Sequence, residues 1–576
     1  MLNTTQFSTN ALTVLRKRFL KKDAHGEPVE TPQQMFRRVA NNIALADSFY
    51  SATPSEVGET ADEFYELMAS LKFLPSTNCL RNAGRRLQQL FPCFVLPLED
   101  SLESIYETLK NSALIFRTGG AVGISFSKLR PRGSLLDSTG GVSSGPVSFM
   151  KLFDVSTGVI NEECMRYGGT MGLLRVDHPD ILEFIQVKNE EGNLGNFNLS
   201  VVITDDFMTA LEKGEDYSLF NPLTAQEDQK LSAEEVFEKL VASAWQSAEP
   251  GLIFIDEINR HNPTPHLGLF EAVNLCGEQP LLPYEGCNLG AVSINRMVND
   301  AGRLDYEDLK QVVHQAVHFL DNVIDVNFYV IPETREVSRG NRKVGLGIRG
   351  FAEALIKMGI AYNSDLGRKT AEELMQFIQK EACLASGNLA RKRGNFPRFL
   401  GSVWDKRGVK YLRNATLTTL APNGTTSLIA DCTGGIEPIF GLVHKRRHMK
   451  TLQDQDLYYL NPEFKRVAEE KGFYSQALIE KISQTGSCQG VDEVPEEIQK
   501  IFVTAHDISP EDHVKMQSVF QKYTDNAVSK TVNLPENSTL EDVKKVYRLA
   551  YQLKCKGVTV YRDKSRTKQV LNKIKN

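Results

Sequence analysis

Short apolar runs alternate with longer amphipathic stretches from about residue 74 onward, and this alternation constrains the fold more than any other feature of the 576-residue chain. The apolar runs include 123–126, 199–203 and 251–255, and stretches with helical apolar spacing include 101–116, 232–247, 308–325 and 369–390. Strands that alternate with helices form βαβ units, so the pattern predicts a largely parallel α/β architecture. Because no composition break interrupts it, one large barrel or sheet is favoured over several small domains.

The region before this alternation has a different pattern. Residues 33–50 and 61–73 show helical apolar spacing with polar faces between. The sequence therefore predicts a small N-terminal helical domain over residues 1–73, followed by an α/β domain over residues 74–576.

Composition excludes several classes of protein. A net charge of -5 and a pI near 6.1 lack the basic footprint of a nucleic-acid binder, and the basic run 445–448 is interpreted as a solvated helix face. There is no continuous apolar signal segment and no apolar run of membrane-spanning length, which predicts a cytoplasmic protein with no membrane partner. Nine cysteines in such a protein are expected to be thiols. Since no C-x-x-C occurs, no metal site is expected.

Two motifs match the patterns of a dinucleotide-binding loop and a metalloprotease helix, but the neighbouring residues do not favour either function. Gly345, Gly347 and Gly350 match the dinucleotide-binding pattern, but polar residues precede them where a buried strand is required, so a tight turn before a closely packed helix is predicted. His314 and His318 have metalloprotease spacing but lack the intervening glutamate, so two histidines on a partly exposed helix face are expected.

The most informative segment contains Asn274, Cys276 and Glu278, followed by Cys287. In an extended loop, period-two alternation would point the first three side chains the same way. They would then offer a sulfur, a general base and an amide to one bound molecule. Taken alone, Cys-x-Glu also fits a buried structural cysteine beside a surface glutamate.

This segment, NLCGEQP followed by GCNLG, resembles the radical-cysteine loop of ribonucleotide reductases. Further segments resemble other signatures of that family and occur in the same order: 92–101 (PCFVLPLEDS), 140–150 (GGVSSGPVSFM), 175–182 (RVDHPDIL), 421–427 (APNGTTS) and 556–563 (KGVTVYRD). The resemblance implies a ten-stranded α/β barrel of two antiparallel half-barrels with a central finger loop. It also implies reduction of ribonucleotides, in particular diphosphates, to 2′-deoxyribonucleotides for DNA synthesis.

The resemblance assigns roles to the cysteines. Cys276 would become the thiyl radical, Glu278 would take the 3′-hydroxyl proton and Asn274 would hold the ribose hydroxyls. Cys93 and Cys287 would supply two electrons by forming a disulfide. The residues before Cys93, Phe91 and Pro92, depart from the family pattern and put the local substrate contact in doubt. The other cysteines are expected to be buried or incidental: Cys79, Cys164, Cys383, Cys432, Cys488 and Cys555.

Nucleotide contacts follow from the same resemblance. Substrate phosphates are expected at a loop that opens a helix, with further substrate contacts from Ser76 and Thr77. A deoxynucleoside triphosphate effector is expected near Asp100 and Arg130, at the interface of a homodimer. The phosphate loop comprises Pro422, Asn423, Gly424, Thr425, Thr426 and Ser427, and the glycine-rich segment 167–172, with Gly168 and Gly169, would relay effector identity to the substrate.

The expected radical source is adenosylcobalamin. Segment 556–563 contains a single tyrosine, Tyr561, where a subunit-dependent reductase would have an adjacent pair, and there is no glycyl-radical motif. The alternatives are a chain that requires a radical-generating subunit and a catalytically silent nucleotide-binding regulator. No ATP-cone domain and no C-terminal cysteine tail are expected, so a thioredoxin-like protein or another thiol is the expected reductant.

Overall fold

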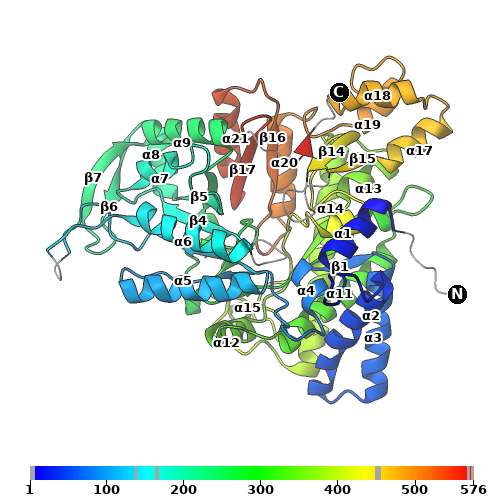
Figure 1. Cartoon of the computed structure of the whole chain (residues 1–576), viewed down its shortest axis with the longest axis horizontal. Helices are drawn as coiled ribbons and strands as arrows, with labels where there is room; N and C mark the ends of the chain where they lie inside the picture. The colour runs from blue at the N-terminus through cyan, green and yellow to red at the C-terminus, as the bar shows by residue number, and fades with distance from the viewer. Residues whose placement is uncertain (1–6, 137–139, 163–167, 448–455, 567–570, 573–576) are drawn as a thin grey trace.

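The computed structural model describes residues 7–136, 140–162, 168–447, 456–566 and 571–572 (Figure 1). The N-terminal helical region consists of α1 (Thr9–Arg18), α2 (Pro32–Ala44), the 3-10 helix η1 (Leu45–Tyr50) and α3 (Pro54–Ala69). Thr31 and Thr53 begin α2 and α3 with capping boxes followed by proline, which satisfies the first backbone N–H groups. The predicted helices are therefore present, although 33–50 divides into two and 61–73 starts earlier. The domain boundary after residue 73 stays a prediction.

Five parallel strands form one half of the main sheet. They are β2 (Cys93–Val95), β3 (Ala121–Ser125), β4 (Thr170–Arg175), β5 (Phe197–Ile203) and β8 (Gly251–Phe254). Helices α5 (Leu102–Arg117), α6 (Pro146–Glu162) and α9 (Ala233–Ser247) connect them (Figure 1). The predicted apolar runs lie in β3, β5 and β8, or end one residue beyond them.

The second half is built from segments later in the chain. β12 (Leu289–Ser293) pairs in parallel with β13 (Gly345–Arg349), and β16 (Thr531–Leu534) with β17 (Gly557–Arg562). Between these pairs, residues 418–420 form parallel bridges to Leu346 of β13 and to Val528, just before β16. Helices α11 (Tyr306–Val326) and α14 (Asp365–Arg393) correspond to the predicted helical stretches 308–325 and 369–390.

The two halves meet through antiparallel pairs at both edges. β17 pairs with β8, and β11 (Gly286–Cys287) pairs with β2. Because β11 continues through Asn288 into β12, one strand joins the halves at the second edge. The pairings followed in order thus return to β2, with five strand segments from each half. This is the arrangement of two antiparallel half-barrels that the resemblance implied.

A short hairpin occupies the interior of this ring. It consists of β9 (Ala272–Val273) and β10 (Pro280–Leu281). A Cβ added to Gly123 would lie 1.8 Å from the Val273 carbonyl oxygen, so β3 needs glycine at this approach. At the tip, Asn198 Nδ2 donates to the Leu275 carbonyl (3.1 Å) and the Ala527 N–H to the Glu278 carbonyl (2.8 Å). Contacts with both halves make this hairpin the expected finger loop.

Three local predictions need correction or refinement. Segment 345–349 is strand β13 rather than a tight turn, because it pairs with β12; only Gly350, at φ 68°, turns into α13 (Phe351–Lys357). Residues 443–447 form strand β14 (Val443–Arg447) rather than a helix face, because they pair with β15 (Asp456–Leu460); His448 lies outside the described residues. His314 and His318 are half-buried, as predicted.

No helix in the described part of the chain has both the length and the apolarity needed to cross a membrane.

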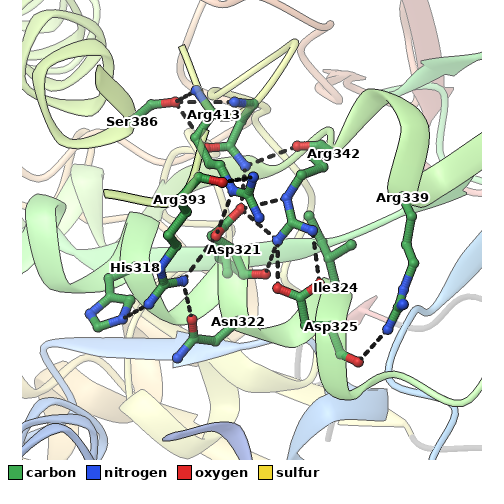
Figure 2. Close-up of polar contacts among 12 residues, drawn as sticks. His318, Asp321, Asn322, Ile324, Asp325, Arg339, Arg342, Ser386, Arg393 and Arg413 are labelled. Atoms are coloured by element: carbon green, nitrogen blue, oxygen red, sulfur yellow. Dashed lines mark hydrogen bonds and ion pairs between the residues drawn. The ribbon is translucent and has the colours of Figure 1, made fainter. Parts of the chain in front are cut away.

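A buried ionic cluster lies in the second half-barrel (Figure 2), and one of its arginines connects it to the N-terminal helical region. At its centre Asp321 of α11, fully buried, lies 2.8 Å from Arg342, 3.1 Å from Arg393 and 3.3 Å from Arg413. Arg393 also contacts Asp47 of η1. Burial alone would raise the pKa of Asp321, but the three guanidinium groups lower it to about 2.

Asp321→Asn should markedly destabilise the chain, because it leaves buried guanidinium groups without their shared counter-charge. Removing one partner of a buried ion pair costs about 3–5 kcal/mol of unfolding free energy. The control is Glu107→Gln, which removes an exposed pair with Lys110 and should cost under about 1 kcal/mol. Thermal unfolding of the three proteins tests this, and equal melting temperatures would contradict it.

Candidate active site

The tip of the finger hairpin is a tight turn. The Asn274 N–H donates to the Gln279 carbonyl (3.1 Å), the Gly277 N–H donates to the Asn274 carbonyl (3.0 Å), and Gly277 has φ 79°. The predicted extended alternation is therefore wrong at this point. Asn274 and Glu278 are buried at 0% and 2% exposure, whereas Cys276 is exposed. The turn places the sulfur at the surface of the tip and the two polar side chains below it.

Several buried polar atoms at the tip have no hydrogen-bond partner among the described residues. They are Asn274 Nδ2, Glu278 Oε2 and both amide atoms of Gln279, which is 0% exposed. Buried polar groups are normally paired, since an unpaired one costs about 1–3 kcal/mol. A polar ligand placed against the tip would satisfy them. Sequence reasoning missed Gln279, and its only signal was its position next to Glu278.

Burial raises the pKa of the Glu278 carboxyl from 4.5 to about 7. The adjacent Asn274 amide lowers this pKa in part, although it lies outside hydrogen-bond geometry. A carboxyl that titrates near neutrality is suited to accept and return a proton. The geometry therefore combines an exposed thiol with a buried base on one turn.

The Glu278→Gln variant should be more stable than the unsubstituted chain at pH 8, and this gain in stability should be smaller at pH 5. The carboxyl binds its proton more tightly in the folded state, so its ionisation costs folding free energy as the pH rises from about 4.5 through about 7. The amide avoids this cost. The melting-temperature difference from the unsubstituted chain should therefore grow with pH.

The control for this experiment is Glu238→Gln. A hydrogen bond from Lys544 lowers the pKa of Glu238, so its amide variant should show no gain at pH 8. The same pH-dependent gain in both variants would contradict the buried-base interpretation.

Cys93 and Cys287 lie directly opposite each other where β11 pairs with β2. Residues opposite each other in an antiparallel pair have Cα atoms about 4.5–5.5 Å apart, within the range of a disulfide. Both are buried and neither forms a disulfide in this structure. The pKa of the Cys287 thiol is raised well above its usual value, mainly by burial and further by the neighbouring Cys93. The structure thus brings together the two cysteines that the resemblance paired.

Glu285 anchors the strand that carries Cys287. Its carboxylate accepts from Lys343 Nζ (2.7 Å), Asn341 Nδ2 (2.7 Å) and the Leu282 N–H (2.9 Å). The Lys343–Glu285 ion pair is almost completely buried. Because Gly286 follows directly, these bonds hold the start of β11 in register with β2.

The predicted phosphate loop follows the strand segment that ends near Ala421. Asn423, at φ 53°, donates from Nδ2 to the Ile348 carbonyl (3.2 Å), and the loop continues into α16 (Thr426–Ala430). Arg18 of α1 donates from Nη1 to Thr425 Oγ1 (3.1 Å). A cavity of about 460 Å³ adjoins the loop at Pro422, Gly424 and Ser427.

The remaining predicted substrate residues lie at the other end of β12. Ser76 caps α4 (Thr77–Asn82), and its N–H donates to the carbonyl of Leu289, the first residue of β12 (2.8 Å). Ser76 and Thr77 are both half-buried.

Among the predicted effector residues, Arg130 Nε lies 2.7 Å from Asp100 Oδ2. The Gly168 N–H donates to Asn161 Oδ1 (2.7 Å), and a Cβ on Gly169 would lie 3.2 Å from Leu275 Cδ1. The glycine segment therefore contacts the finger tip next to Cys276. Asp100 and Arg130 bond to each other rather than to this segment, and Tyr167 lies outside the described residues.

Comparison with known proteins places these features in a family. The ribonucleotide reductase barrel domain matches residues 92–412 and 405–561, and the ribonucleotide reductase all-alpha domain matches residues 5–88. The chain is 44% identical to the vitamin B12-dependent ribonucleoside-diphosphate reductase of Thermoplasma acidophilum, over 98% of this chain and 80% of that one. It is also 44% identical to the protein of the same name from Mycobacterium tuberculosis, over 98% and 81%.

A solved structure shares the fold. The alpha subunit of the Actinobacillus ureae class Id ribonucleotide reductase superposes with a TM-score of 0.79 and 22% identity, and the match covers 97% of each chain. Together with the matched domains, these relatives show that the chain belongs to the ribonucleotide reductase family, whose members convert ribonucleotides to deoxyribonucleotides.

Proposed function

We propose that the chain is an adenosylcobalamin-dependent ribonucleoside-diphosphate reductase. The observation that carries this proposal is the finger tip, where an exposed Cys276 lies above buried atoms of Asn274 and Glu278 that have no hydrogen-bond partner among the described residues. The names of the Thermoplasma and Mycobacterium relatives supply the cofactor and the diphosphate substrate.

The exposure of the tip fits an external radical source. Leu275 and Gly277 are half-buried and Cys276 is exposed, so these three residues would lie beneath a cofactor docked over the hairpin. Adenosylcobalamin, when bound, supplies an organic radical by homolysis of its cobalt–carbon bond. β17 offers one tyrosine, Tyr561, which is half-buried, so no adjacent tyrosine pair supports the subunit-dependent alternative.

We assign the chemistry at the ribose to the finger tip. The Cys276 thiyl radical would abstract the 3′ hydrogen atom and return it at the end of the cycle. Glu278 would accept the 3′-hydroxyl proton, for which a pKa of about 7 is suitable. Asn274, and Gln279 beside it, would hydrogen-bond the ribose hydroxyls with amide atoms that otherwise have no partner in the described structure.

Cys93 and Cys287 would provide the reducing equivalents. The 2′-hydroxyl leaves as water, and replacing it with hydrogen requires two electrons and two protons. Two thiols that become one disulfide supply both. Their opposite positions on β2 and β11 support this role. A thioredoxin-like protein or another thiol would then reduce the disulfide.

The nucleotide contacts complete the proposal. Substrate phosphates would bind at residues 422–427, with Ser76 and Thr77 as further contacts. A deoxynucleoside triphosphate would bind near Asp100 and Arg130, and Gly168 and Gly169 would link it to the finger tip, which Gly169 contacts. We further propose that the enzyme acts in the cytoplasm.

An exposed apolar face supports a homodimer. Leu102 and Tyr106 on α5 are exposed, as are Val155 and Val159 on α6, and each pair is one helical turn apart. The two helices lie side by side (Figure 1). Exposed apolar patches of this kind mark protein interfaces, and a second copy of this chain is the proposed occupant.

The test is a reductase assay with the purified chain, adenosylcobalamin, a ribonucleoside diphosphate and excess dithiol. Deoxynucleotide should form without any added radical subunit. Cys276→Ser should reduce turnover to background while nucleotide binding persists, because the hydroxyl cannot form an equivalent radical. Activity only with an added metal-containing subunit would contradict the cofactor, whereas substantial activity of Cys276→Ser would contradict the radical site.

A further inference from the structure

Arg349 is a fully buried arginine whose charge is not balanced within the described structure. Its exposure is 0%, and Nη2 donates to the carbonyls of Leu74 (2.9 Å) and Ala291 (3.1 Å). Nε and Nη1 are buried without a hydrogen-bond partner in the described ranges, and no carboxylate there forms an ion pair with this guanidinium. Nothing in the sequence motifs pointed to this residue.

Two other buried cations near it in the sequence are compensated. Arg342 and Lys343, which are comparably buried, each contact a carboxylate at 2.8 Å or closer. Burying a charge without a counter-charge is costly, so such groups are generally paired or bind a ligand. The described residues around Arg349 supply no anionic partner, so a bound anion could take that place.

Arg349 faces the interior of the barrel. A Cβ on Gly345 would lie 2.6 Å from Leu289 Cδ2, and Leu289 packs in the same interior cluster as Cys93 and Cys287. Side chains on a strand alternate, so Gly345, Gly347 and Arg349 share this interior face of β13. Leu346 and Ile348 belong instead to the core on the outer side.

Arg349 is the last residue of β13, and its backbone lies beside the proposed phosphate loop. Asn423 of that loop donates to the carbonyl of Ile348, the residue before Arg349 (3.2 Å). Ser293, opposite Arg349 on β12, has a buried hydroxyl that is also without a partner among the residues described.

We propose that Arg349 is a substrate-binding residue that donates through Nε and Nη1 to the diphosphate of the ribonucleotide, with Ser293 as a further donor. This rests on the proposed reductase function and extends the phosphate site from the loop at 422–427 to the wall of the barrel. An arginine fork matches the oxygen geometry of a phosphate and supplies the missing counter-charge.

The experiment measures the dissociation constants of CDP and of cytidine for the full chain, with a saturating deoxynucleoside triphosphate present to fill the effector site. Arg349→Met should weaken CDP binding by about 10- to 100-fold, because hydrogen bonds to a charged group are lost, and should leave cytidine binding unchanged. Arg368→Met, which removes a half-buried arginine paired with Asp512, is the matched control and should change neither constant.

Each outcome has a definite meaning. Equal weakening of CDP binding and cytidine binding would show that Arg349 only supports the fold, and this would overturn the proposal. Unchanged CDP binding would also overturn it. If Arg349→Met does not fold, Arg349→Lys decides: it keeps the charge but loses the fork, so CDP binding should still weaken by about tenfold, and an unchanged constant overturns the proposal. Failure of the unsubstituted chain to bind CDP would instead contradict the proposed diphosphate substrate.

Discussion

The antiparallel pairing of β11 with β2 is the interaction on which the rest of the structure depends. It joins the two half-barrels at one edge, because β11 runs directly into β12. The same two-residue pairing sets Cys287 opposite Cys93. A one-residue slip of register would turn the Cys287 side chain to the other face of the sheet and separate the thiols. The buried bonds of Glu285 to Lys343 and Asn341 act immediately before this pair and oppose such a slip.

Four buried charged residues differ in how many partners they have, and this difference underlies the roles proposed for them. Asp321 and Glu285 have several buried partners each, so their networks hold elements together. Glu278 and Arg349 are equally buried, but each has polar atoms without a partner in the described structure. Glu278 lies on the finger hairpin inside the ring, and Arg349 lies on β13, a strand of the ring, on its interior face. A nucleotide bound between these two residues would place its ribose at Glu278 and its phosphates at Arg349.

Much of the architecture could be predicted from local patterns. β3, β5 and β8 were predicted because fully buried strands are continuous apolar runs, and α9, α11 and α14 because apolar spacing marks a packed helix face. The turn at Cys276 was mistaken for extended chain because the left-handed conformation of Gly277 depends on the hairpin around it. Strand 345–349 was missed because its glycines and Arg349 face the interior, which no local pattern records. The roles of Cys276, Glu278 and Asn274 came from family resemblance, whereas Gln279 and Arg349 needed the burial and bonding that only the folded chain provides.

The most direct test of the account is to locate the oxidising equivalents after a single turnover. The reduced chain would turn over once with adenosylcobalamin, effector and a limiting ribonucleoside diphosphate in the absence of reductant, then be quenched with a thiol-alkylating reagent and digested. The account predicts a disulfide between Cys93 and Cys287 in proportion to the deoxynucleotide formed, with Cys276 recovered as the alkylated thiol. Deoxynucleotide formed in full while Cys93 and Cys287 are both alkylated would contradict it.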